Sequence, residues 1–253
     1  MKTKTSNTSK KRGNNLLRLG LIVGVIGGVI VERSLSEKKR HMPHLDLWRR
    51  ELAKTRGEVQ ATVLAARIQE RYDELYAHRP RFAGQALRWH LESNILPGLA
   101  LYQILRETVG KGAALAEVEK LFAAWVESRR YPLWALEYVP GSFSIFRRLV
   151  NLQMKLNYPP EGWAIQYKAN DDQKVAFDIQ GCFYLDALTA YGAPELTARF
   201  CAGDDVMFAR LPPSLTWQRT TTLGRGGERC DFCWQHVVKR TTESDLQHLT
   251  LGL

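Results

Sequence analysis

The four cysteines of this chain lie close together in the sequence, and cysteine is a residue type with several chemistries open to it. Cys182, Cys201, Cys230 and Cys233 all fall within residues 182–233 of a 253-residue chain. A thiolate can act as a nucleophile or as a metal ligand, whereas a thiol in an apolar core is inert. Four cysteines are too few for the disulfide scaffold of a small secreted protein. Their clustering favours one shared neighbourhood, although each one taken singly is typical of a buried core residue.

A metal site is one hypothesis for these thiols. Cys230 and Cys233 form a single Cys-x-x-Cys pair, which is a weak zinc signal when the other two cysteines are scattered. In a regular strand the two side chains point to opposite faces, which argues against joint ligation and against a thioredoxin-like redox pair. The possibility left open is a metal ion bound through Cys182, Cys201 and Cys230.

Asp204, Asp205 and Arg219 lie between the cysteines and offer acid-base and anion-binding chemistry. A carboxylate whose pKa is raised by burial can act as a general base; we favour Asp205, with Asp204 as the alternative. A guanidinium binds a carboxylate through a bidentate fork, so Arg219 is the best candidate to hold an acidic substrate. The structural alternatives are a helix cap or turn for the aspartates and an outward strand position for the arginine.

The residues that follow Arg219 could bind negative charge. The hydroxyls of Thr220 and Thr222, and the backbone N–H groups of the Gly226-Gly227 turn, are donors of the kind that stabilise an oxyanion. Threonine is also common in strands without any special role. The run from Gly224 to Gly227 is equally typical of a hairpin turn and lacks the spacing of a phosphate-binding loop.

Several short motifs follow one another in an order that is informative as a series. They are, in chain order, Asn94-Ile95-Leu96-Pro97-Gly98-Leu99-Ala100-Leu101-Tyr102, Cys182-Phe183-Tyr184, Gly192-Ala193-Pro194-Glu195-Leu196, Cys201, Asp204-Asp205, Arg219-Thr220-Thr221-Thr222-Leu223, Gly226-Gly227 and Cys230-Asp231-Phe232. Over about residues 85 to 235 this series resembles the L-2-amino-thiazoline-4-carboxylic acid hydrolase family. The fold also resembles, more loosely, vinyl-reductase-type small-ligand domains.

The resemblance implies a hydrolase that opens a small cyclic amidine or thiazoline carboxylate by adding water to the C=N carbon, giving a carbamoyl-cysteine on a route to cysteine. Asp205 would then be the base and Arg219 the carboxylate anchor. Cys230, with Cys182 and Cys201, would supply the thiol chemistry. Cys233 and the N-terminal segment depart from the family's pattern. They favour a second hypothesis, a membrane-tethered small-ligand or metal-binding sensor domain without catalysis.

The hydrophobic periodicity predicts an α+β fold. After Pro159-Pro160 apolar residues alternate in two runs joined by the turn residues Asn170-Asp171-Asp172, which predicts a hairpin. Two helices follow, one over residues 182–191 and one from about residue 194. Residues 214–223 and 229–238 are predicted as a second strand pair. The order β-β-α-α-β-β makes a small antiparallel sheet, on which an N-terminal helical block packs.

The helical block is predicted from residue 45 to about residue 156. A first helix should end at His78-Arg79-Pro80 with Val59 and Val63 on its inward stripe. A second surrounds Pro97-Gly98, and a third covers about residues 115–129. His90 lies in the second helix, and we interpret it as a surface or boundary residue because no second metal ligand stands three or four positions later.

The N-terminal segment is basic and apolar, and we interpret it as a membrane tether. Residues 1–41 carry a net charge of +8 out of the chain's +10, so the remaining body is nearly neutral, which argues against nucleic acid as a partner. The thirteen uncharged residues at 19–31 are short for a bilayer, which asks for about 20. Attachment through residues 16–31 therefore needs Arg18 to snorkel. A signal peptide, or a segment that is neither, is the alternative.

The predicted organisation is a basic N-terminus with a short apolar helix (1–41), a helical region (42–158), a cysteine-containing α+β region (159–240) and a tail (241–253). The expected location is the membrane, with the folded domain in the cytoplasm, where thiols stay reduced. A soluble cytoplasmic protein is the alternative. The expected partners are the small-molecule substrate and the membrane.

Overall fold

The computed structural model of the protein describes residues 41–129, 139 and 141–237, and the chain divides into the units Met1–His41 and Met42–Leu253. The predicted membrane segment, residues 16–31, and the predicted tail, residues 241–253, lie outside the described residues. Within the described residues no helix is long and apolar enough to cross a membrane. The account below therefore concerns the second unit.

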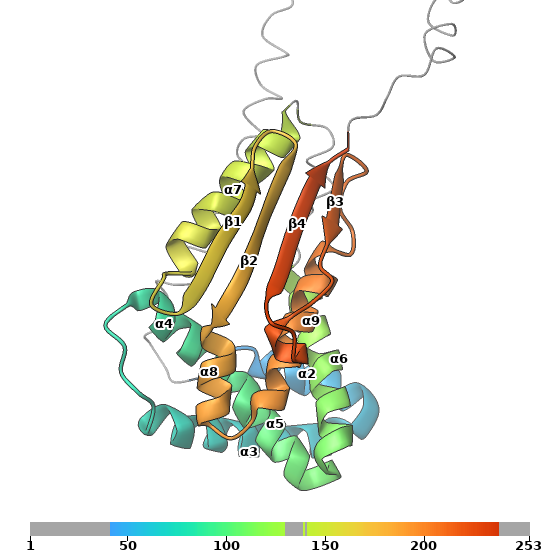
Figure 1. Ribbon diagram of the computed structural model, residues 1–253. Helices are drawn as coiled ribbons and strands as arrows, with labels where there is room; N and C mark the ends of the chain where they lie inside the picture. Colours follow the sequence, from blue (N-terminus) through green and yellow to red (C-terminus); the bar gives the residue numbers. More distant parts are fainter. Residues whose placement is uncertain (1–40, 130–138, 140, 238–253) are drawn as a thin grey trace, which may run out of the picture. The chain divides into compact units, whose positions relative to one another are not determined.

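The first part of the second unit is helical, as predicted. Its elements are α2 (Leu45–Arg56), α3 (Glu58–Ala77), α4 (Gln85–His90), the π-helical turn η1 (Leu91–Ile95), α5 (Leu96–Val109), α6 (Lys111–Arg129) and α7 (Ser142–Asn157) (Figure 1). The core of this part is made of fully buried side chains such as Trp48, Leu99 and Tyr102.

The first predicted helix is two helices. Gly57 separates α2 from α3 with a φ of 79°, a left-handed conformation that favours glycine and ends an α-helix. The break changes the direction of the chain and with it the buried face. Val59 and Val63, predicted on the inward stripe, are 82% and 57% exposed. That part of the prediction was wrong because a stripe was extended across a helix boundary.

The second predicted helix is continuous through Pro97. Proline has no N–H to donate, and Pro97 is the second residue of α5, in the first turn after the π-helical turn. The chain instead passes through a π-helical turn, η1, directly before α5. Such turns insert one residue into a helix and rotate the side chains that follow, and they occur often at functional sites. η1 carries the buried Asn94.

The second part of the unit has the predicted order of strands and helices. Its elements are β1 (Trp163–Asn170), β2 (Lys174–Cys182), α8 (Phe183–Ala190), the 3-10 turn η3 (Pro194–Leu196), α9 (Thr197–Phe208), β3 (Leu215–Gln218), the 3-10 turn η4 (Leu223–Arg225) and β4 (Cys230–His236). The strands form one antiparallel sheet in the order β1-β2-β4-β3. The fold class is α+β.

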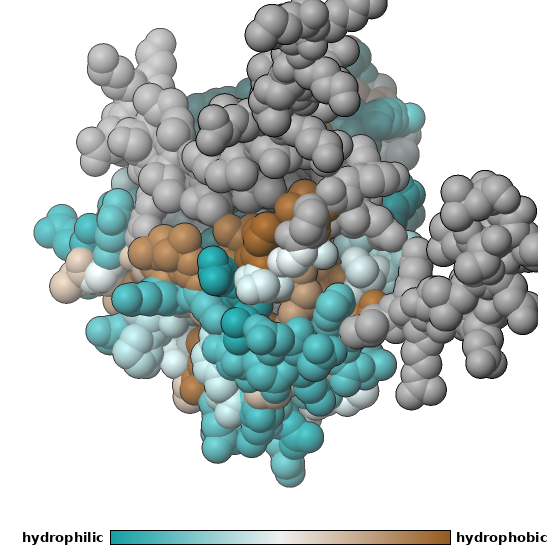
Figure 2. Space-filling view, turned by 90° about the horizontal axis from the view of Figure 1, so that it is seen from above, coloured by the Kyte–Doolittle hydropathy of each residue, from teal (hydrophilic) through white to brown (hydrophobic). Residues whose placement is uncertain are grey.

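One face of the sheet packs against helices α7 and α9. Trp234 of β4 is 3% exposed, and its ring contacts Phe146 of α7 at 5.8 Å and Phe208 of α9 at 5.1 Å between ring centroids. Both helices therefore meet the same face, which also carries Phe177 and Cys230 at alternating positions. In Figure 1 the lower end of the sheet runs into α8 and α9. Seen from above, hydrophilic side chains dominate the coloured surface, with a band of hydrophobic ones across it (Figure 2).

The predicted strand over residues 214–223 is much shorter. β3 ends at Gln218, and residues 219–229 form a long connection to β4 that contains η4. The threonines at 220–222 suit a strand by propensity, but the connection is instead fixed by hydrogen bonds to Asp231. This connection, residues 219–229, is called the β3–β4 loop below.

Candidate functional site

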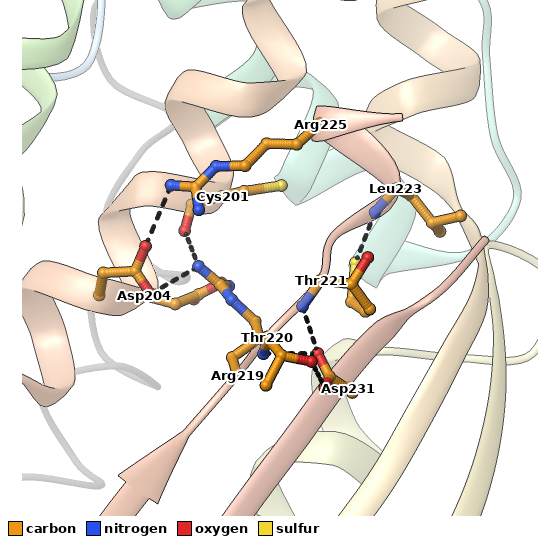
Figure 3. A network of polar contacts seen from close by, with 10 residues as sticks. Cys201, Asp204, Arg219, Thr220, Thr221, Leu223, Arg225 and Asp231 are labelled. Atoms are coloured by element: carbon orange, nitrogen blue, oxygen red, sulfur yellow. Dashed lines mark hydrogen bonds and ion pairs between the residues drawn. The ribbon is translucent and has the colours of Figure 1, made fainter. Parts of the chain in front are cut away.

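Arg219 begins the β3–β4 loop and holds it against helix α9. Its side chain is 2% exposed. One terminal nitrogen donates to Asp204 Oδ2 at 2.6 Å, and the other donates to Asp205 Oδ1 at 2.7 Å and to the carbonyl of Cys201 at 2.8 Å (Figure 3). The guanidinium thus bonds to three residues within about one turn of α9. The carboxylate anchor predicted at Arg219 stays a prediction, since here this fork is bonded within the protein.

The two aspartates lie within α9, where neither caps a helix end nor forms a turn. Asp205 binds both Arg219 and, at 3.3 Å, Arg225 of the loop. Asp204 binds Arg219 through one oxygen. Successive residues on an α-helix are about 100° apart around the axis, so these neighbours face different surroundings.

Asp204 has the properties of a general base. Desolvation by the surrounding protein raises its pKa to about 6, and the nearby Arg219 charge opposes this rise without cancelling it. Its side chain is nevertheless 42% exposed. A carboxylate that water can reach, but that the protein desolvates, is typical of a recessed surface. A pKa near 6 lets the group accept a proton at neutral pH.

Three of the four cysteines lie together next to Asp204, as their clustering in the sequence predicted. Cys201 is on α9 one turn before Asp204, Cys230 is the first residue of β4 and Cys182 is the last residue of β2. Electrostatic interactions link Cys182 with both other thiols. Burial raises the pKa of Cys182 to about 11, so its thiol keeps its proton.

Cys201 and Cys230 are hydrogen-bonded to each other. Cys201 donates to the sulfur of Cys230, which also accepts the backbone N–H of Leu223 at 3.2 Å. These two donors lower the pKa of Cys230, whereas the same bond and burial raise the pKa of Cys201. Of the two thiols, Cys230 is therefore the one that loses its proton more readily.

Cys233 lies apart from this cluster. The regular pairing of β4 with β2 sets Cys230 opposite Ile179 and Cys233 opposite Ala176, so the two cysteines alternate to opposite faces, as predicted. No group of three or more His, Cys, Asp and Glu side chains in the described part of the chain could hold a metal ion. Cys182, Cys201 and Cys230 do not form such a group, so the metal site considered for them is not found in the described structure.

A model of the L-2-amino-thiazoline-4-carboxylic acid hydrolase family matches residues 88–234, more than half of the chain. The chain belongs to this family. The match begins in α4 and ends in β4, so it includes η1, the cysteine cluster, Asp204 and the whole β3–β4 loop. A comparison with curated proteins finds no match. Membership confirms the resemblance found in the sequence and names the protein's class as a hydrolase.

The family match also covers part of the helical segment. There the structure buries a polar side chain, His90, that the sequence analysis did not expect inside the protein. His90 was interpreted as a surface or boundary residue, yet it is 2% exposed. One ring nitrogen, Nε2, lies 2.8 Å from the carbonyl of Asn157, and Nδ1 lies 2.9 Å from the hydroxyl of Tyr184. The correction has a simple cause: the partners of His90 come from α7 and α8, which are far away in sequence.

These contacts set the direction of the hydrogen bonds that His90 makes when its ring is neutral. The Asn157 carbonyl can only accept, so Nε2 carries the ring proton and Nδ1 accepts from the Tyr184 hydroxyl. Asn94 of η1 donates to the Tyr184 oxygen. The chain of donors therefore runs from Asn94 through Tyr184 and His90 to the end of α7.

Two tyrosines, Tyr158 and Tyr184, connect the hydrogen bonds of the helical part with the surroundings of Asp204. Burial, followed by the nearby Asp204 and Cys182 charges, raises the pKa of Tyr158 above its usual range. Burial and the neighbouring Tyr158 likewise raise the pKa of Tyr184, with smaller effects from Cys182 and Asp204. Among the described residues the Tyr158 hydroxyl makes no hydrogen bond, unlike that of Tyr184. Tyr158 is thus a protonated donor within electrostatic reach of Asp204.

The predicted anion donors of the β3–β4 loop are bonded within the loop or to Asp231 of β4. Thr220 donates its hydroxyl and its N–H to Asp231, and the N–H of Gly227 donates to the carbonyl of Thr222 at 3.0 Å. The side chain of Thr222 is 1% exposed. Their contact with a substrate stays a prediction; in the structure they give the loop its shape.

At two glycines, aromatic rings or a sulfur atom pack directly against the backbone. A Cβ on Gly98 of α5 would lie 2.6 Å from Phe200 and 2.7 Å from Phe122, and one on Gly224 of the loop would lie 2.9 Å from the sulfur of Cys201. Phe200 in turn contacts Tyr184 at 5.0 Å between ring centroids. Packing against α9 therefore needs glycine at both positions.

Proposed function

We propose that this hydrolase opens a small cyclic amidine or 2-amino-thiazoline carboxylate by adding water to its C=N carbon. Family membership supports the substrate class. The observation that carries the proposal is Asp204, an accessible carboxylate with a pKa of about 6 within electrostatic reach of the protonated Tyr158. A base and an acid whose pKa values are pushed apart by their surroundings are what such a hydrolysis requires.

In the proposed reaction Asp204 takes a proton from water while the water oxygen bonds to the C=N carbon. The electron pair of the C=N bond moves to nitrogen and leaves a tetrahedral carbon. That nitrogen takes the proton from Asp204. The new hydroxyl then gives its proton to Asp204 and becomes a carbonyl as a ring bond from the same carbon, to nitrogen or to sulfur, breaks. The departing atom takes a proton from Tyr158, and Asp204 returns its proton to Tyr158. The product is a ring-opened carbamoyl compound. Burial raises the pKa of Tyr158, so its hydroxyl is protonated at neutral pH and has a proton to donate.

The substrate carboxylate needs a cation near Asp204. Arg219 is 2% exposed and already binds two aspartates, whereas the side chain of Arg225 is 57% exposed and meets only Asp205, at 3.3 Å. Figure 3 shows Arg225 extending over the same turn of α9. We therefore propose Arg225 as the anchor and Arg219 as the residue that positions Asp204. A long 3.3 Å contact is readily exchanged for a substrate carboxylate.

The test is hydrolysis of 2-amino-thiazoline-4-carboxylate by the full-length protein in water labelled with oxygen-18. We expect a ring-opened product that carries one labelled oxygen, detected by mass spectrometry. Replacement of Asp204 by Asn should lower kcat/KM by about 10²–10⁴-fold, the range for loss of a general base. The wild-type kcat/KM should rise with pH through about pH 6, because the base works only when deprotonated.

The matched control is Asp172→Asn, which changes the same group on the exposed β1–β2 turn, where the side chain is 80% exposed. Its kcat/KM should equal that of the wild type. An inactive wild-type protein would contradict the proposed substrate class. A fully active Asp204→Asn variant would leave the class intact and remove Asp204 as the base.

We further propose that the chain attaches to a membrane through residues 16–31, with the folded domain on the cytoplasmic side. The support for attachment is the uncharged run, and the support for the cytoplasmic side is the free cysteines, which stay reduced there. Full-length protein should sediment with membranes, and Ile22→Asp with Ile26→Asp should release it. Recovery of the unaltered chain in the soluble fraction would contradict the attachment.

A further inference from the structure

The paired thiols of Cys201 and Cys230 form a group that the proposed hydrolysis does not use. Cys201 comes from α9 and Cys230 from β4, and the fold brings their sulfur atoms within hydrogen-bonding distance. Both are free thiols. Gly224 of the β3–β4 loop lies against the sulfur of Cys201, and the backbone N–H of the neighbouring Leu223 donates to that of Cys230. The loop therefore contacts both sulfur atoms.

The two sulfurs have different characters. Cys230 accepts two hydrogen bonds, from Cys201 and Leu223, and Arg219 adds a nearby positive charge; together these lower its pKa. Cys201 donates the bond and keeps its proton. A thiol whose pKa is lowered by neighbouring donors, beside a second thiol, is an arrangement found in cysteines that react with oxidants. The side of the pair that solvent reaches is Cys201, which is half-buried, whereas Cys230 is 6% exposed.

We propose that Cys201 and Cys230 form an oxidation site that reacts with a hydroperoxide and closes to an intramolecular disulfide. The Cys230 thiolate attacks the terminal peroxide oxygen, the O–O bond breaks, and the leaving alkoxide or hydroxide takes a proton. The resulting sulfenic acid on Cys230 is attacked by the Cys201 sulfur; the S–S bond forms, the S–O bond breaks, and water leaves with the Cys201 proton. Two thiols are oxidised and one peroxide is reduced.

The other two cysteines are poor partners in this reaction. Cys182 is close to the pair, but burial raises its pKa to about 11, so it offers little thiolate. Cys233 lies on the opposite face of β4. The residues around the pair therefore select one disulfide out of the six that four cysteines allow.

The consequence is a covalent link between α9 and β4 one helical turn from Asp204. Cys201 also offers its carbonyl to Arg219, which holds Asp204. Closing the bond to about 2.05 Å should pull on this turn of the helix. The oxidation itself does not depend on the proposed hydrolysis, so each can fail without the other.

The test treats the full-length protein with one equivalent of hydrogen peroxide and then alkylates the remaining thiols under denaturing conditions. We expect a mass loss of two hydrogens, two of the four thiols protected from alkylation, and a Cys201–Cys230 crosslink in the peptide map. Dithiothreitol should restore all four thiols. Any other crosslinked pair, or four reactive thiols after ten equivalents of peroxide, would overturn the proposal.

Three serine variants make the assignment specific. Cys230→Ser should slow thiol loss by about tenfold or more, because the reactive thiolate is gone. Cys201→Ser should instead accumulate a sulfenic acid on Cys230 that dimedone labels. Cys233→Ser is the matched control on the same strand and should react like the wild type. Dimedone labelling at Cys182 or Cys233 in the Cys201→Ser variant would also overturn the proposal.

Discussion

The helical segment Gln85–Val109 and the segment Thr197–Cys230 both supply the candidate site, but they hold their side chains by different means. The first uses neutral hydrogen bonds, from Asn94 through Tyr184 to His90, and close packing on Gly98. The second uses ion pairs on Arg219 and a thiol pair. The second segment carries Asp204, whose pKa of about 6 places its change of protonation near neutrality.

Loss of one residue should lower the free energy of unfolding most in the second segment, which is held by ion pairs. Replacing Arg219 by Met leaves two carboxylates next to each other without their cation. We expect a loss of about 2–4 kcal/mol in the free energy of unfolding, less than for fully buried charges because water reaches both aspartates. Urea unfolding measures this loss, and the exposed Arg225→Met is the matched control, expected within about 0.5 kcal/mol of the wild type. Equal losses in the two variants would contradict the structural role of Arg219.

The packing of the helical side can be tested at Gly98. The Cβ added by Gly98→Ala would stand 2.6 Å from Phe200 and 2.7 Å from Phe122, so these rings must move. We expect a loss of about 1–3 kcal/mol in urea unfolding, the usual effect of overpacking. Gly112→Ala in α6 has nothing within 4 Å of the new Cβ and should be neutral or stabilising by up to about 1 kcal/mol. A neutral Gly98→Ala would show that the close approach is not required.

The neutral hydrogen bonds can be tested at Tyr184. Replacing Tyr184 by Phe leaves Nδ1 of the buried His90 without its donor. We expect a loss of about 1–2 kcal/mol in the free energy of unfolding. Tyr167→Phe removes a hydroxyl that bonds an exposed asparagine and should have almost no effect. If the two variants unfold alike, the network does not stabilise the helical side.

The smallest expected effect is the pH dependence contributed by Asp204. Its pKa in the folded protein, about 6, is above its ordinary value, so the folded state binds the proton more tightly than the unfolded state does. This contribution to stability is present below about pH 4 and is lost as pH rises through about 6. The difference between wild type and Asp204→Asn in urea midpoint, followed from pH 4 to pH 8, should show this trend. An opposite trend would mean that the ion pair with Arg219 outweighs desolvation.

Much of the fold could be predicted, because the patterns that carried it are local. The alternation at Ile165 and Tyr167, and the left-handed Gly192 after α8, were sufficient for the order of strands and helices. The errors arose where one pattern had two interpretations. Gly57 was not treated as a helix break, and the threonines after Arg219 suited a strand although they form a loop.

The candidate site could be predicted only in part. Three cysteines form the expected neighbourhood, since Cys182 ends β2, Cys230 begins β4 and Cys201 lies in α9 close to both. The choice of Asp204 over Asp205 could not be made, because adjacent helical residues are distinguished only by what surrounds the helix. The same holds for Arg219, whose burial depends on the packing of the β3–β4 loop against α9.

By itself the sequence determined the family, the α+β order and the set of residues able to do chemistry, because composition, periodicity and motif order are properties of the chain alone. The tertiary structure decided which member of each set faces which partner. It turned His90 inward, paired Cys201 with Cys230 and desolvated Asp204. Those outcomes depend on partners far away in the sequence, and the protonation of each group follows from them.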